Sequence, residues 1–149
     1  MMMNHYGKWW DDTITLYNKV TDRDGKVTWY RHLLEECFYK HTVEKVTTGD
    51  TTLTSDSSIC RIKVSDKFIT KREYDMLDDS AKEMLFTLAA GDIIVPEEVD
   101  FEIDEYTRGK RSSDLIKEYK DYPGCFTIEI VDVNVSGGRG NEHYKVKGM

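Results

Sequence analysis

Six carboxylates stand close together near the middle of the chain, and paired carboxylates are a common catalytic device. They are Glu97, Glu98, Asp100, Glu102, Asp104 and Glu105, with no cation among them. Two carboxylates that flank a glycosidic bond can hydrolyse it, one as general acid and the other as nucleophile or base. The apolar residues that alternate with them favour another interpretation, in which the run is the solvated face of a strand.

A basic segment follows the acidic run directly. It contains Arg108, Lys110, Arg111, Lys117 and Lys120 against only two acids, Asp114 and Glu118. A segment with two opposite electrostatic ends suits head-to-tail contact with a copy of itself or with a neighbouring protein. It suits an active site less well, so the sequence favours an assembly role over catalysis.

Other residue types that could do chemistry lack the required spacing. His5, His32, His41 and His143 form no HxH or HExxH pattern and no Cys/His pairing. Asp22, Asp24 and Gly25 resemble the start of a calcium loop, but its twelfth position is Leu33 and not Glu. No Ser lies in GxSxG, and the glycines at 136–140 stand between two predicted strands, as in a hairpin turn. We therefore expect no catalytic residues, no metal site and no cofactor.

Composition limits the class of protein. The 149 residues are most simply one domain, with residues 1–11 as an N-terminal arm, and the net charge is -7. This charge argues against a general nucleic-acid binder, although DNA could still pass an acidic wall. The three widely spaced cysteines predict buried reduced thiols. Neither a signal peptide nor a long apolar run is visible, so no membrane segment is expected.

The first half of the chain predicts strands. Residues 13–20 alternate apolar and polar side chains, and 26–34 do the same after a turn at Asp24-Gly25. A third strand is expected around residues 37–39. The Thr- and Ser-rich stretch 41–58 predicts a long loop or a protruding hairpin around Gly49-Asp50. A further strand is expected at 59–64.

The second half mixes strands with helix. A short helix is expected within 70–86, then strand, turn and strand over 86–95, and a strand with Val99, Phe101 and Ile103 inward over 97–105.

Ser112 and Ser113 predict the start of a helix near 113–122. Residues 125–135 predict the longest strand, with a bulge or burial on both faces where its apolar phase shifts, and a last strand follows at the C-terminus. The fold class is therefore mainly β (α+β), a small antiparallel barrel or sandwich.

Four stretches together resemble a family of small phage and prophage proteins encoded among head and tail structural proteins. They are WYRHLLEECFY, TLAAGDIIVPEEVDFEID, EYTRGKRSSDLIKEY and GCFTIEIVDVNVSGGRGNEHYKVKG. The ending with His143-Tyr144 and the segment 91–95, GDIIV, are similar to head-closure and neck connector proteins, which are small β-barrels. The stretch 41–58 and the helix near 113–122 depart from that pattern.

The resemblance implies a non-enzymatic ring subunit at the head–tail junction of a virion. Such a subunit is assembled in the bacterial host cytoplasm and contacts copies of itself, portal- or adaptor-side proteins and tail-side proteins, with DNA passing nearby and no membrane involved. The lateral contact is expected to join the six carboxylates above to Arg108, Lys110 and Arg111. The expected apolar anchors are Trp9, Trp10, Trp29, Tyr30 and Tyr106.

Three alternatives remain open on sequence. A tail-completion or minor capsid protein would share the same core. A phage accessory module could bind the particle without entering a ring. A hydrolase could use carboxylates within 97–105.

Overall fold

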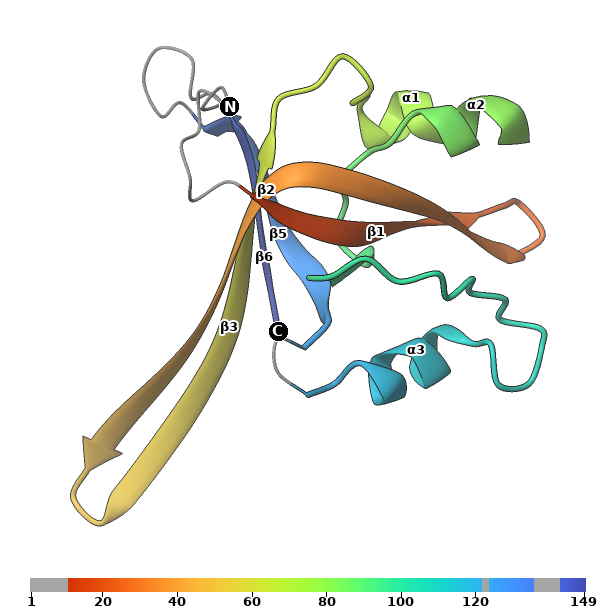
Figure 1. Cartoon of the computed structure of the whole chain (residues 1–149). Helices are drawn as coiled ribbons and strands as arrows, with labels where there is room; N and C mark the ends of the chain where they lie inside the picture. Colours follow the sequence, from red (N-terminus) through yellow and green to blue (C-terminus); the bar gives the residue numbers. More distant parts are fainter. Residues whose placement is uncertain (1–10, 122–123, 136–142) are drawn as a thin grey trace.

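Six antiparallel strands close into a barrel in the order β1-β2-β3-β6-β5-β4 in a computed structural model of the chain (Figure 1). The structure describes residues 11–121, 124–135 and 143–149. The strands are β1 Asp12–Thr21, β2 Val27–Thr48, β3 Thr51–Lys63, β4 Ile93–Val95, β5 Phe126–Val135 and β6 His143–Gly148. The helices are α1 Lys71–Asp75, α2 Asp79–Met84 and α3 Ser112–Glu118. The predicted mainly β fold is confirmed. Of the two architectures that the sequence left open, barrel and sandwich, the structure forms the barrel.

Strand β2 pairs with two neighbouring strands, one along its first half and the other along its second half. It pairs with β1 over Val27–Cys37 and with β3 over Cys37–Thr48. The change of partner occurs at a bulge, where β2 carries one residue more than β1 between Leu34 and Cys37. Glu36 in this bulge has a φ of 56°, a conformation that few non-glycine residues adopt. β2 bends at the bulge but continues through it as a single strand. The two strands predicted at 26–34 and 37–39 are therefore parts of one strand.

The longest strand is β2, with 22 residues, and the prediction that 125–135 would be the longest is wrong. The alternation of apolar and polar residues is weak in the Thr-rich part of β2. The sequence pattern therefore did not reveal how far this strand extends. The bulge predicted in β5 is confirmed, since its register with β6 shifts between Ile128 and Ile130.

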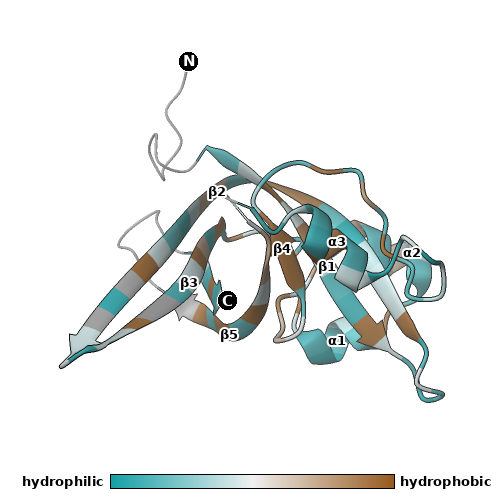
Figure 2. Ribbon diagram, turned by 90° about the horizontal axis from the view of Figure 1, so that it is seen from below, coloured by the Kyte–Doolittle hydropathy of each residue, from teal (hydrophilic) through white to brown (hydrophobic). Residues whose placement is uncertain are grey.

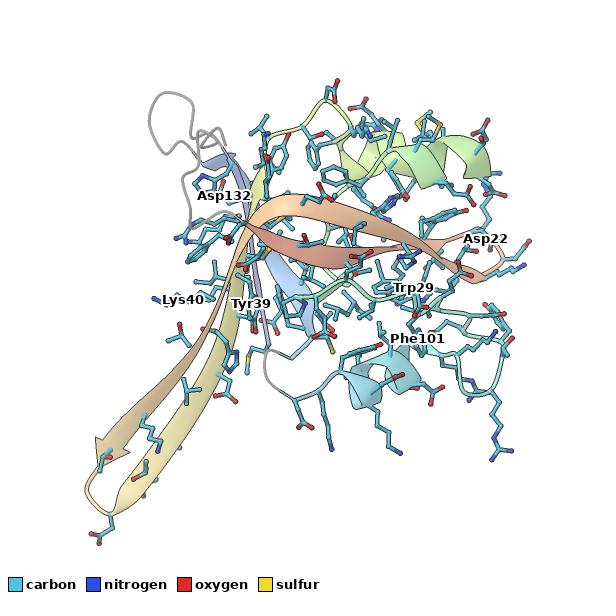
Figure 3. The ribbon with its side chains drawn as sticks, viewed as in Figure 1. Asp22, Trp29, Tyr39, Lys40, Phe101 and Asp132 are labelled. Atoms are coloured by element: carbon cyan, nitrogen blue, oxygen red, sulfur yellow. The ribbon has the colours of Figure 1, made fainter. Side chains whose placement is uncertain are left out.

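Two apolar clusters stabilise the fold. The larger fills the barrel with side chains from β1, β3, β5 and β6, including Ile14, Ile62, Ile128 and Val146. Figure 2 shows that β4 is hydrophobic along its length. The smaller cluster lies outside β1 and β4 beneath α3 and includes Tyr17 and Leu115, with Trp29 and Phe101 packed against it (Figure 3). Cys37 and Cys60 are buried as expected, and Cys125 is half-buried.

A buried polar cluster replaces the first of the two strands predicted over 86–95. The Asn18 amide donates to the Thr87 carbonyl at 2.7 Å and to the Asp92 carboxylate at 2.9 Å. The backbone N–H groups of Lys19 and Ala89 also donate to Asp92, at 2.9 and 3.0 Å. These bonds tie residues 87–92 to β1 through side chains instead of through a strand ladder.

Helices α1 and α2 are joined to β2 by a second buried polar contact. The Thr70 and Asp78 side chains cap the two helices. The Tyr74 hydroxyl donates to the Lys82 carbonyl at 2.7 Å, and its oxygen lies 3.1 Å from Nε2 of His32. Because this hydroxyl proton is used, His32 is the donor in the second bond, so its neutral form carries the proton on Nε2.

His32 should make the protein sensitive to acid. Burial and the nearby Arg31 guanidinium lower the pKa of His32 to about 4 from its usual 6.5. Between these values the unfolded chain binds a proton that the folded chain does not, so stability is lost as pH falls. The shift corresponds to about 3 kcal/mol. We expect wild type to lose about this much relative to His32→Gln between pH 7 and pH 4, measured by urea unfolding. Parallel pH profiles for the two proteins would contradict this assignment.

Candidate interaction surface

The stretch 41–58 forms a two-stranded extension of the barrel, and its protruding-hairpin interpretation is confirmed. We call residues 42–57 the projecting hairpin. Its strands pair from Thr42 with Ser57 up to Thr48 with Thr51, and Gly49 takes the positive φ of 61° that the turn requires. The pairing of β3 with β6 ends at Ser58, so beyond this point neither strand pairs with a third segment among the described residues. Figure 1 shows the hairpin pointing away from the barrel.

Both faces of the projecting hairpin expose an aliphatic side chain. Val43 is 52% exposed and Leu53 is 64% exposed. Val43 pairs with Asp56, and Leu53 pairs with Val46. Because positions 43 and 46 are three residues apart on one strand, Val43 and Leu53 lie on opposite faces of the hairpin. A two-stranded hairpin without a covered face is at best marginally stable in water. The projecting hairpin therefore has the properties of a segment that is stabilised by a partner on either side.

The acidic run does not form the strand that was predicted. Residues 98–104 have no regular secondary structure, although their side chains alternate as expected, with Val99 buried and Asp100 exposed. The segment is held without a strand ladder. The Thr15 hydroxyl donates to the Glu97 carbonyl at 2.8 Å and accepts the Val99 N–H at 3.0 Å, and the Tyr17 hydroxyl donates to the Phe101 carbonyl at 2.6 Å. Side chains of β1 thus replace a neighbouring strand.

The structure divides the six carboxylates into two groups. Asp104 accepts the Thr107 hydroxyl at 2.7 Å and the Tyr106 N–H at 2.9 Å, and these bonds lower the pKa of Asp104. Glu105 accepts the Ser112 N–H at 2.6 Å. The remaining four make no side-chain hydrogen bond or ion pair with another described residue and are exposed: Glu97, Glu98, Asp100 and Glu102. Only these four are free for a contact with another molecule.

The helix start also differs from the prediction. Arg111, and not a serine, is the N-cap of α3, and the Asp114 carboxylate accepts the Arg111 N–H at 3.0 Å. Glu105 and Asp114 thus accept the N–H groups of Ser112 and Arg111 at the start of the helix. Arg108 and Lys110 are exposed before the helix, without an ion pair to another described residue.

The predicted apolar anchors have different environments. Trp9 and Trp10 lie outside the described residues. Tyr30 is only 9% exposed and its hydroxyl donates to Asp79 at 2.7 Å, while Trp29 packs on the cluster beneath α3. Tyr106 is 60% exposed, and its hydroxyl accepts the Val27 N–H at 2.9 Å. Of the described anchors, Tyr106 is the one available to a partner.

A groove borders the bulge of β2 and escaped the sequence prediction. Its volume is about 770 Å³, and it lies between residues 31–36 of β2, residues 62–67 and the end of α2. Leu33, Val64 and Met84 line it and are 41%, 43% and 72% exposed. Val64 lies just beyond β3, because the strand predicted over 59–64 ends at Lys63. We call this space the bulge groove.

Residues suited to catalysis do not converge among the described residues. No group of three or more His, Cys, Asp or Glu side chains in that part of the chain could hold a metal ion. Ser58 and His41 are joined at 3.0 Å between Oγ and Nδ1. Ser58 is only 3% exposed, and the two residues lie directly opposite each other on β3 and β2. We therefore interpret this hydrogen bond as a cross-strand contact and not as a catalytic pair.

Comparison with known proteins gives one match. The model of a family described as "Family of unknown function (DUF6751)" matches residues 9–149. Neither the curated proteins nor the solved structures contain a match to the chain. Within the described residues, no helix has the length and apolar character needed to cross a membrane.

Proposed function

The chain belongs to DUF6751, a family of unknown function. From the resemblance of its sequence to phage proteins together with its geometry, we propose that it is a structural subunit of a tailed phage particle. In this proposal the subunits assemble into a ring at the head–tail junction. The observation that carries the ring assembly is the projecting hairpin, which extends from a closed barrel and exposes aliphatic side chains on both faces. Such an element suits a ring subunit, because each copy must bury surface against a neighbour on either side.

The charged segments support a head-to-tail contact between copies. Glu97, Glu98, Asp100 and Glu102 are exposed at one end of the segment, and Arg108, Lys110 and Arg111 are exposed at the other. Two different and complementary surfaces on one subunit generate a closed ring if the rotation between copies permits. Exposed pairs contribute about 0–1 kcal/mol each, so they favour correct register more than affinity.

Charge reversal tests this contact. In the phage or prophage element that encodes the protein, Glu102→Lys and Arg111→Glu should each lower the yield of tailed particles, since each places like charges together. The double variant should recover yield, because it restores opposite charges. Electron microscopy of particles would measure the effect, with a deletion of the gene as the reference for complete loss.

Three outcomes separate the alternatives. Normal tailed particles after deletion of the gene would exclude an essential ring subunit and favour an accessory module. Normal assembly in both single variants would exclude the charged contact but would leave the ring assembly itself possible. Loss of an enzymatic activity in Asp100→Ala with assembly intact would favour the hydrolase.

A further inference from the structure

We propose that the bulge groove binds the projecting hairpin of a second copy of this chain, which adds its β2 edge as an extra strand. The inference rests on the proposed ring assembly and identifies the two surfaces that meet. It follows from an unpaired strand edge in the groove, an aliphatic floor, unpaired acids at its rim, and a hairpin with matching features.

The groove contains a β edge beside which no other described strand pairs. Residues 31–34 of β2 pair with β1 on one side, Glu35 and Glu36 form the bulge, and the pairing with β3 begins only at Cys37. In an antiparallel strand, alternate residues direct their N–H and C=O groups away from a given neighbour. No backbone hydrogen bond joins residues 31–36 to another described segment on the open side. Cys37 reaches two of these carbonyls, those of Leu34 and Glu35, through its thiol at 3.8 and 3.6 Å, which are weak contacts.

The rest of the groove suits a strand with mixed side chains. Leu33, Val64 and Met84 supply exposed aliphatic surface. Glu35, Asp66 and Glu83 also line the groove, are exposed, and form no side-chain hydrogen bond or ion pair with another described residue. Of the three cations in the lining, Lys63 pairs with Glu36 at 2.6 Å, Arg31 donates to the Val99 carbonyl at 3.0 Å, and Lys67 is exposed. The four acids of the lining thus exceed its cations by one.

The β2 edge of the projecting hairpin offers the complementary features. Beyond Cys37 it no longer pairs with β1, so residues 42–48 are an open edge among the residues that the structure describes. Seven strand residues span roughly 23 Å, close to the roughly 20 Å of the six groove residues at about 3.3 Å each. Val43 and Lys45 are exposed and two residues apart, hence on one face. That spacing can place Val43 on the aliphatic floor and Lys45 beside the unpaired acids.

The hairpin must come from another copy. Within one chain, β2 runs continuously from the groove into the projecting hairpin, and the hairpin points away from α1 and α2 (Figure 1). A hairpin that enters the groove of the next copy makes a contact between two different surfaces, which can repeat around a ring. Strand addition of this kind gains affinity from backbone hydrogen bonds and specificity from alternate side chains.

Disulfide trapping tests the contact in the full-length protein. One preparation carries Val43→Cys and the other Leu33→Cys, both with Cys125→Ser, and the two are mixed under mild oxidation. We expect a covalent heterodimer, at least tenfold more abundant than with the matched control Asp24→Cys, an exposed turn position remote from the groove, in place of Leu33→Cys. A yield equal to the control would overturn the inference.

Charge exchange gives an independent measurement by sedimentation. Lys45→Glu and Glu83→Lys should each weaken self-association about tenfold, and the double variant should recover it; Lys26→Glu is the control for net charge. Self-association that persists unchanged in both single variants, without the specific disulfide, would refute the groove while leaving ring assembly in place. Normal particle assembly after deletion of the gene would instead remove the proposed function itself.

Discussion

Shortening the projecting hairpin is expected to abolish assembly of tailed particles while the barrel stays folded. Deleting residues 43–48 and 51–56 lets the native Gly49-Asp50 turn join Thr42 to Ser57. Six residues leave each strand, so the alternation of side chains and of hydrogen-bonded pairs is preserved. Within the part of the chain that the structure describes, the deleted residues pair only with each other, so the barrel loses no ladder contact. Particle yield by electron microscopy and thermal unfolding by circular dichroism measure the two effects.

A finer variant separates the shape of the hairpin from its surface. Val43→Thr with Leu53→Thr keeps both strands but removes the exposed aliphatic groups, and we expect at least a tenfold loss of particles. Normal particle yield in the shortened protein would contradict the role of the hairpin. Unfolding of the shortened protein would contradict the claim that the barrel is complete without it.

The second large effect is expected at Asp92, which is 1% exposed at the centre of the buried polar cluster. Asp92→Ala leaves three donors without their acceptor, the N–H groups of Lys19 and Ala89 and the amide of Asn18. Each unsatisfied buried donor costs roughly 1–3 kcal/mol, partly offset by removal of a buried charge. We expect a loss of about 2–4 kcal/mol at pH 7, measured by urea unfolding, against less than about 0.5 kcal/mol for exposed Asp100→Ala.

The effect of Asp92→Ala should grow in acid. Burial raises the pKa of Asp92 to about 6 from 3.8, against the opposing hydrogen bonds from Lys19 and Asn18. Between these values the folded chain binds a proton that the unfolded chain does not, so this group lowers stability as pH rises. The gap between wild type and Asp92→Ala should therefore widen by about 2 kcal/mol from pH 7 to pH 4. A gap that narrows in acid would show that hydrogen bonding outweighs burial at this carboxyl.

His32 and Asp92 act in opposite directions over the same pH range. The titration of His32 lowers the stability of the folded protein as pH falls, and the titration of Asp92 lowers it as pH rises. Comparing each variant with wild type at every pH isolates one group at a time, because the other is common to both proteins. The two tests together therefore report on two separate buried contacts, one on β1 and one beneath α1.

Local patterns in the sequence were enough for several elements. The alternation over 13–20 and the Gly25 turn predicted β1 and the start of β2, since period-2 burial and positive φ depend on neighbouring residues alone. The glycine at 49 likewise predicted the turn of the projecting hairpin. The same alternation misled over 97–105, because side chains can alternate inward and outward without a strand beside them.

The candidate surface was predictable only in part. Its acidic and basic residues were visible as a charge pattern, but the internal use of Asp104 and Glu105 was not, because it depends on where residues 106–114 fold back. Tyr30 could not be recognised as buried, since Asp79 is far from it in sequence. The bulge groove left no local signal, because three separate segments form it.

From its residues alone, the chain therefore specifies a mainly β fold, its turns and two opposite charged segments, because these depend on contacts between near neighbours. Closure into a barrel, the length of β2 and the groove at its bulge depend on pairing between distant segments. Their free energy comes from burying surfaces that only the folded chain brings together. The acidic run illustrates the division: its charge was visible in the sequence, whereas the four carboxylates that remain free were selected by the fold.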